Sequence, residues 1–106
     1  MKSKSRRYEL LLPMRFNDAR DVPDELLAEA VLEIVEQFGA VSFYKNAVEG
    51  HWRHEETTYR DDLALLVVDV ADTAKNRKWM KAYKAKWKER LEQLELWMVS
   101  YPIDIE

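Results

Sequence analysis

The sequence predicts one α+β domain, a ferredoxin-like βαββαβ sandwich in which two helices cover one face of a four-stranded antiparallel sheet. The chain has 106 residues, 47% hydrophobic content and no cysteine, which suits one core that needs no disulfide. Segments of period two and of helical periodicity follow in the order strand, helix, strand, strand, helix, strand. Right-handed crossovers then place both helices on the same face. We expect residues 1–7 to form a flexible basic tail and residues 8–106 to form the domain.

The first half of the chain contains one strand and one helix. Apolar residues alternate with others from Tyr8 to Phe16, which predicts a strand. Because this fold places its first strand centrally, Pro13 predicts a bulge or a local loss of pairing. Pro23 suits the first turn of a helix, and Gly39 suits its end.

The middle of the chain is the least regular segment. A second strand is expected over residues 40–48, followed by a turn at Glu49-Gly50 and a polar stretch over 51–62 that can form a long hairpin arm. Residues 63–68 are apolar at successive positions, which predicts a central strand covered on both faces.

A long helix and an edge strand complete the pattern. Asp72 or Thr73 can cap a helix that runs to about Leu94. The last strand is expected from Leu96 onward, at a sheet edge because Pro102 cannot donate a hydrogen bond to a neighbouring strand.

Seven different short motifs are scattered along nearly the whole chain: Phe16-Asn17-Asp18, Val22-Pro23-Asp24-Glu25-Leu26-Leu27, Gln37-Phe38-Gly39, Gly50-His51-Trp52, Tyr59-Arg60-Asp61-Asp62, Asn76-Arg77 and Tyr83-Lys84. Through these motifs the sequence resembles a group of short bacterial proteins of uncharacterised function. It departs from the group at Ala40, where a second glycine is expected. The resemblance implies relatives with the same βαββαβ order and carries no activity over to this chain.

The two predicted helices are opposite in charge. Residues 21–44 contain six acidic residues and no basic one, whereas residues 75–90 contain eight basic residues and one acidic one. We interpret this as attraction between neighbouring helices with solvated outer faces. The alternative is a surface that binds nucleic-acid phosphates with an affinity that falls steeply as salt rises. That surface would comprise Lys75, Arg77, Lys78, Lys81, Lys84, Lys86, Lys88 and Arg90.

Two further features invite a chemical role. His51 and His54 are metal-ligand types, but outside a helix their spacing does not place them on one side, so we interpret them as part of a solvated hairpin and expect no metal or cofactor. Asp18 follows the first strand, as in the ferredoxin-like metal-dependent nucleases of CRISPR adaptation that this position resembles. Because an Asp after a strand is ordinarily a turn former, we expect no catalytic residue there. If Asp18 does act, Asp18→Asn should abolish magnesium-dependent cleavage without affecting folding.

One face of the predicted sheet is left without a cover, because its third strand is apolar on both faces and the two helices cover only one of them. Leu11, Trp97, Val99 and Tyr101 can add to the open face, depending on register. A large exposed apolar patch normally marks an interface, so we expect a homodimer packed sheet against sheet. A small-ligand pocket between sheet and helices is expected to be lined by Arg15, Trp52, Tyr59, Asp61 and Asp62.

The sequence therefore predicts a cytoplasmic bacterial protein with no membrane partner, acting as a non-enzymatic homodimeric binding or interaction domain. The alternative is a nucleic-acid-binding protein or a metal-dependent nuclease that uses the basic second helix and Asp18.

Overall fold

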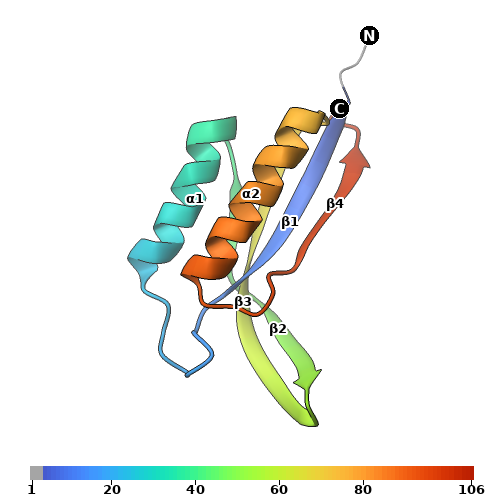
Figure 1. The fold of residues 1–106 in the computed structure, drawn as a ribbon. Helices are drawn as coiled ribbons and strands as arrows, with labels where there is room; N and C mark the ends of the chain where they lie inside the picture. The colour runs from blue at the N-terminus through green and yellow to red at the C-terminus, as the bar shows by residue number, and fades with distance from the viewer. Residues whose placement is uncertain (1–3) are drawn as a thin grey trace.

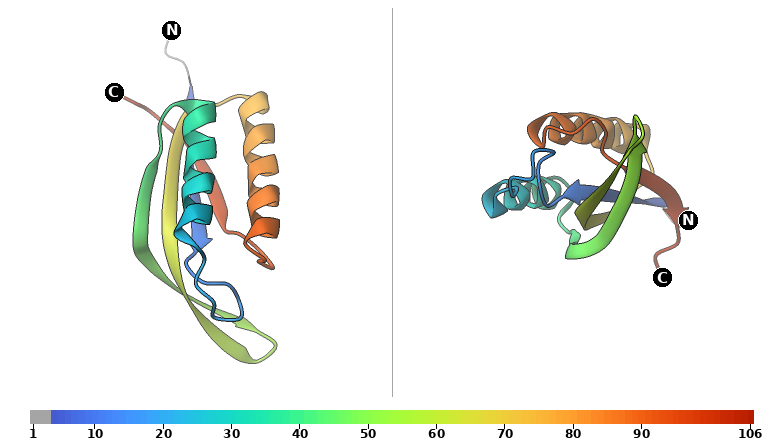
Figure 2. Two further views of the ribbon diagram at one scale, coloured as in Figure 1. Left: turned by 90° about the vertical axis from the view of Figure 1, so that its left-hand side faces the viewer. Right: turned by 90° about the horizontal axis from the view of Figure 1, so that it is seen from below.

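The computed structural model describes residues 4–106 and has the predicted order of elements (Figure 1). The strands form one antiparallel sheet in the order β2-β3-β1-β4, and both helices lie on the same side of it (Figure 2). This arrangement confirms the ferredoxin-like α+β sandwich. The elements are β1 (Ser5–Pro13), α1 (Asp24–Phe38), β2 (Ser42–His54), β3 (Thr57–Ala71), α2 (Ala74–Arg90) and β4 (Met98–Ile103).

The core lies between the helices and the two central strands. Alternate residues of β1 and β3, among them Leu10 and Leu66, are fully buried. Trp87 is also fully buried and is the largest such side chain. The alternation of residues that predicts these strands therefore also indicates which of their faces packs against α1 and α2.

β1 begins earlier than expected. Arg6 lies opposite Val70 and Arg7 opposite Asp69, so residues 5–7 belong to the sheet and the boundary of the predicted tail is wrong. Both side chains form ion pairs: Arg7 with Asp69 at 2.7 Å and Arg6 with Asp72 at 3.0 Å. Basic residues can therefore stand in a central strand here. Residues 1–3 of the predicted tail lie outside the described residues.

Pro13 loses pairing on one side only. The Leu11 amide donates to the Trp97 carbonyl at 3.0 Å, and β4 pairs with β1 no further than Leu10. The next amide on that side would be that of Pro13, which has no N–H to donate. Pro13 still lies in register with Leu63 of β3, so the predicted local loss of pairing is confirmed without a bulge between β1 and β3.

The β2–β3 hairpin is longer than predicted, and the expected turn at Glu49-Gly50 is wrong. Both residues lie within β2, and the turn is at Glu55 and Glu56, where φ is 49° and 70°. Figure 1 shows that this hairpin extends past the ends of the helices. Its far half meets water on both faces, which is why residues 51–62 carry little apolar periodicity.

The segment between α2 and β4 also differs from the prediction. Thr73 caps α2 by accepting a hydrogen bond from the Asn76 amide at 3.1 Å, but the helix ends at Arg90 rather than near Leu94. Glu92 has φ 55°, which the helix cannot continue through. A loop therefore precedes β4, which lies at the sheet edge as predicted. Within residues 4–106 neither helix combines the length and apolar character that crossing a membrane requires.

Candidate functional site

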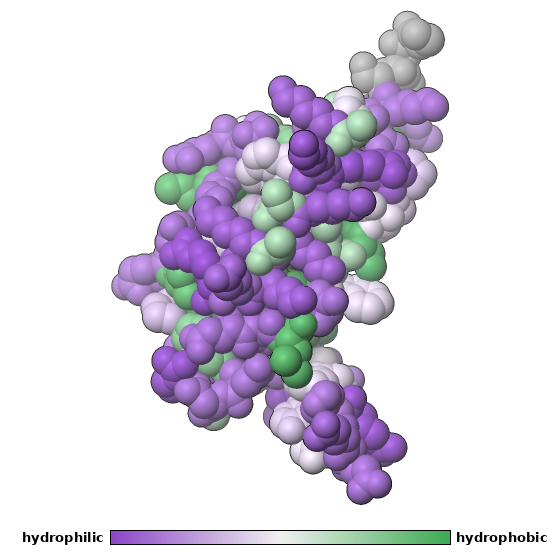
Figure 3. All heavy atoms as spheres, viewed as in Figure 1, coloured by the Kyte–Doolittle hydropathy of each residue, from purple (hydrophilic) through white to green (hydrophobic). Residues whose placement is uncertain are grey.

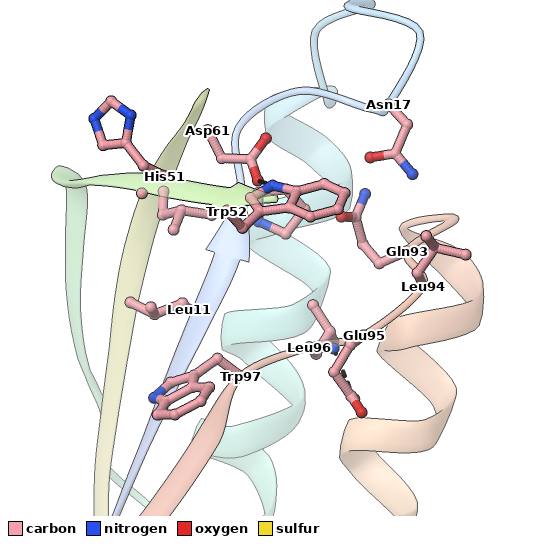
Figure 4. A pocket seen from close by; sticks show the side chains of 13 residues that line it. Leu11, Asn17, His51, Trp52, Asp61, Gln93, Leu94, Glu95, Leu96 and Trp97 are labelled. Carbon is pink, nitrogen blue, oxygen red and sulfur yellow. Dashed lines mark hydrogen bonds between the residues drawn. The ribbon is translucent and has the colours of Figure 1, made fainter. Parts of the chain in front are cut away.

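A cavity of about 360 Å³ opens where the hairpin, the end of β1 and the loop between α2 and β4 meet (Figure 4). β1 contributes Leu11, the hairpin contributes Trp52 and Asp61, and the loop contributes Leu96 and Trp97. Leu11 and Leu63 of the sheet also line the cavity, and both point to the face opposite the helices. The cavity therefore lies at the edge of that face and not, as predicted, between the sheet and the helices, because the hairpin extends past the helix ends. The cavity is a product of hairpin length and of the early end of α2.

An aromatic pair and a carboxylate define the hairpin wall. Trp52 lies opposite Tyr59 across the two strands, and their rings stack with centroids 4.5 Å apart and an interplanar angle of 19°. The Trp52 indole Nε1 donates to an Asp61 carboxylate oxygen at 2.6 Å, as the dashed line in Figure 4 shows. Since residues 59 and 61 are two apart in one strand, they share a face, and the stack and the hydrogen bond fix the indole.

Gly50 keeps this wall open. It lies opposite Asp61, and a Cβ placed on it would come within 2.9 Å of the Leu63 side chain. A larger residue would therefore push Leu63, which also lines the cavity.

A second cavity of about 310 Å³ adjoins the first and shares Asn17, Trp52, Asp61 and Leu94 with it. The structure brings all five residues of the predicted pocket together around this second cavity. These residues are Arg15, Trp52, Tyr59, Asp61 and Asp62. Their role in binding stays a prediction.

Asn17 and the loop between α2 and β4 also line the cavity, and neither is among the predicted pocket residues. The sequence predicts a helix to about Leu94 and a strand from Leu96, so it does not indicate that residues 93–97 line a cavity. The signal that could have placed the start of this loop is the pair of polar residues, Glu92 and Gln93, that directly follows Leu91, which is fully buried.

His51 and His54 are not brought together. Neighbouring residues of a strand alternate between faces, so positions three apart point to opposite sides. His51 contacts Glu49 at 2.8 Å, and Figure 4 shows its imidazole directed away from the cavity. The His51 contact lowers the pKa of Glu49. No group of three potential metal ligands occurs among residues 4–106.

Asp18 forms a turn with Arg20. Its carboxylate accepts a hydrogen bond from the Arg20 amide at 3.1 Å and another from the Arg20 guanidinium. The first of these is the main reason that the pKa of Asp18 lies below its ordinary value. Asp18 lines neither of the two cavities near Trp52. The contacts are those of an Asx turn, the ordinary role of an Asp after a strand.

The two helices attract each other as their charges predict. Lys86 bonds to Glu33 at 2.7 Å, and Arg90 bonds to both oxygens of Glu29 at 2.6 and 2.8 Å. The Arg90 guanidinium also lies 4.5 Å from the centre of the Trp87 ring, and the Trp87 indole donates to Glu33 at 2.8 Å. The hydrogen bond with Arg90 lowers the pKa of Glu29.

The other predicted phosphate ligands divide into two groups. Arg77 pairs with Asp72 at 3.2 Å and Lys84 pairs with Glu95 at 3.1 Å. Half of the eight basic residues are thus engaged by carboxylates of the same chain. The other half form no ion pair within residues 4–106 and are Lys75, Lys78, Lys81 and Lys88.

The face of the sheet opposite the helices is uncovered. Register places Leu11, Leu65 and Val99 on this face, together with Trp97 and Tyr101, which confirms the predicted set. Trp97 is 63% exposed. The helix side of the molecule, by contrast, is mainly hydrophilic in the space-filling view (Figure 3).

The fold has well-matched counterparts among solved structures. No protein-family profile matches the sequence, and no curated protein does. CutA1 from Oryza sativa matches with a TM-score of 0.68 and 14% identity over 98% of this chain and 84% of the other. The divalent cation tolerance protein of Thermus thermophilus gives 0.65 and 14% over 96% and 86%. A phage SAM lyase in complex with S-methyl-5′-thioadenosine gives 0.72 and 10% over 99% and 93%. At these identities the likeness establishes a shared fold.

Proposed function

We propose that this chain is a non-enzymatic binding protein that assembles as a homodimer through the uncovered sheet face and holds a small organic ligand in the cavity beside Trp52. The observation that carries the proposal is the apolar character of the uncovered face. Leu63, Leu65 and Val67 of the central strand β3 point to it and are only half-buried. Exposed apolar surface of this kind normally marks an interface.

Aromatic residues extend the apolar surface to both edges of the sheet. Tyr44 on β2 is 52% exposed, and Tyr101 on β4 is 41% exposed. Aromatic side chains at these exposures are typical of the anchors of protein interfaces.

Three charged residues on β1 and β3 of this face, Arg7, Glu9 and Asp69, already have partners within the chain. Arg7 makes two hydrogen bonds to Asp69, at 2.7 and 3.0 Å, and Tyr101 donates its hydroxyl to Glu9. Covering this part of the face would therefore bury these charges together with their partners, which lowers the main cost of such an interface. Asp61, at the hairpin end of the same face, has no charged partner among residues 4–106 and is considered below as part of the ligand site.

A second copy of the chain is the occupant that this face fits best. It is mainly apolar and the charges of Arg7, Glu9 and Asp69 are partnered internally, so it is compatible with its own copy without needing a surface of opposite charge. Closed two-fold symmetry, in which the same patch serves both partners, is the commonest form of a homo-oligomer.

The ligand site is supported by shape and by a structural neighbour. The cavity is largely apolar with a few polar groups, as small-molecule sites usually are. The phage SAM lyase of the same fold was solved with a nucleoside derivative, so this architecture can hold a small organic molecule. Of the other titratable side chains that line the cavity, His51 contacts Glu49 and Glu95 pairs with Lys84, and this supports binding rather than catalysis.

The assembly is tested by the mass of the protein in solution, measured by light scattering at micromolar concentrations. We expect twice the chain mass of 12.6 kDa for the wild type and a shift toward the monomer for Tyr44→Glu. Leu32→Glu is the matched control, because Leu32 is 53% exposed but lies on α1, away from the sheet face. A monomeric wild type, or a mass that Leu32→Glu changes and Tyr44→Glu does not, would contradict the proposal.

A further inference from the structure

We infer that the cavity beside Trp52 selects a planar organic cation, a heteroaromatic ring with a positive charge, which Asp61 recognises. This rests on the proposed function, because it takes the cavity as the ligand site. The inference is carried by one carboxylate whose charge the described part of the chain does not balance.

Asp61 is half-buried and has one partner among residues 4–106, the Trp52 indole. No lysine, arginine or histidine nitrogen of these residues forms an ion pair with it. Two other carboxylates of the same hairpin do have a charged partner, because the Arg60 guanidinium lies 3.3 Å from Asp62 and 2.7 Å from Glu49. A carboxylate that is partly withdrawn from water gains most from a cation that approaches it, and here that cation must come from outside the described chain.

The rest of the cavity does not supply a positive charge. Its lining contains no lysine or arginine, and its apolar part includes Leu11, Leu63 and Trp97. The other acidic residue, Glu95, is occupied by Lys84 at 3.1 Å and by the Leu96 amide at 2.9 Å. Asp61 is therefore the carboxylate of this lining that has no ion pair among residues 4–106, which favours a cation over an anion.

Trp52 adds the preference for a ring. Tyr59 stacks on one face of the indole, so a ligand ring would stack on the other. An aromatic face also attracts cations through its quadrupole. Because the indole Nε1 is bonded to Asp61 at 2.6 Å, the ring and the carboxylate are held together and can contact one ligand at the same time.

Three probes of nearly the same size separate charge from shape: 1-methylnicotinamide is a cation, nicotinamide is neutral and nicotinate is an anion. Each is titrated into the full chain while the indole N–H signal of Trp52 is followed by NMR. We expect the cation to shift the Trp52 signal and to bind more tightly than the neutral ring by on the order of tenfold, and nicotinate not to bind.

Asp61→Asn removes the charge and keeps an oxygen that can accept the Trp52 hydrogen bond. We expect this variant to lose on the order of tenfold in affinity for 1-methylnicotinamide and to bind nicotinamide as the wild type does. Glu56→Gln is the matched control, because Glu56 is an exposed carboxylate at the turn of the same hairpin and lines neither of the two cavities. It should leave the affinity for the cation unchanged.

Equal binding of the three probes, a cation affinity that Asp61→Asn does not change, or a Trp52 signal that 1-methylnicotinamide does not move would each overturn the inference. The wild-type probe series decides the question even if Asp61→Asn fails to fold. The solution mass is measured on the same samples. A dimer that ignores the cation overturns this inference and leaves the proposed assembly, whereas a monomer that binds the cation overturns the assembly and leaves the cation site.

Discussion

At the scale of single residues, Asp72 links three elements through one carboxylate. It accepts hydrogen bonds from Arg6 of β1 at 3.0 Å and from Arg77 of α2 at 3.2 Å, and its side chain is only 15% exposed. Arg6 also donates to Ser100 of β4 at 3.1 Å. The carboxylate therefore ties the end of β3 to the neighbouring strand and to the helix that follows.

Asp72→Asn should lower stability at neutral pH, with a loss that shrinks in acid. The hydrogen bond with Arg6 is the main reason that the pKa of Asp72 lies below its ordinary value of 3.8. The stabilisation is thus fully present above that value and is lost as the pH falls through the lowered pKa of the folded protein. Urea midpoints measured between pH 7 and pH 2 should converge for the variant and the wild type at the acid end.

Asp21→Asn is the control for this prediction, because the Asp21 side chain is 88% exposed and only contacts Arg15 at 3.5 Å. Its urea midpoint should stay close to that of the wild type at every pH. A gap between Asp72→Asn and the wild type that is constant with pH would mean that the charge of Asp72 does not contribute.

At the scale of elements, the two glycines test different constraints. Gly39 ends α1 with φ 86° and its amide bonds to the Val35 carbonyl at 2.7 Å, while nothing lies within 4 Å of where a Cβ would be. Gly39→Ala should therefore cost about 1 kcal/mol through backbone conformation alone. Gly50→Ala should act through contact with Leu63, whose flexible end can move into the cavity.

Urea unfolding and titration with 1-methylnicotinamide separate these two effects. Gly39→Ala should lower stability and leave binding intact, whereas Gly50→Ala should weaken binding more than it lowers stability. The reverse pattern would show that the wall at Gly50 does not shape the ligand site.

The elements themselves could be predicted from the sequence wherever packing follows periodicity. The alternation in β1 and the apolar run of β3 gave the central strands, and Thr73 and Gly39 gave helix ends. The hairpin turn could not be predicted, because Glu55 and Glu56 carry positive φ without being glycine or asparagine. The glycine at position 50 instead serves close packing, a tertiary reason that the local sequence does not reveal.

At the scale of the whole molecule, the predicted pocket residues account for only part of the lining of the two cavities near Trp52. Trp52, Tyr59 and Asp61 gather because they pair across one hairpin, which local sequence can indicate. The loop that carries Leu96 and Trp97 lies beside these residues only because of the way α2 and β4 pack in the folded chain. Sequence periodicity therefore does not predict that the loop lines the cavity.

The attraction between the helices, in contrast, could be predicted from charge alone. The predicted neighbours α1 and α2 carry opposite signs, and Arg90 and Lys86 meet Glu29 and Glu33 in the folded chain. The uncovered sheet face was predicted by the same reasoning at a larger scale, since two helices can cover only one side of a sheet whose central strand is apolar on both.

The central claim is that a second copy of this chain covers that face. The most direct test is an isotope-filtered NOE experiment on a mixed sample in which one copy carries labelled methyl groups and the other copy does not. We predict contacts between copies at the methyl groups of Leu65, Val67 and Val99, which lie on the uncovered face. The absence of contacts between copies, or contacts at Leu32 of α1 in place of these, would contradict the account.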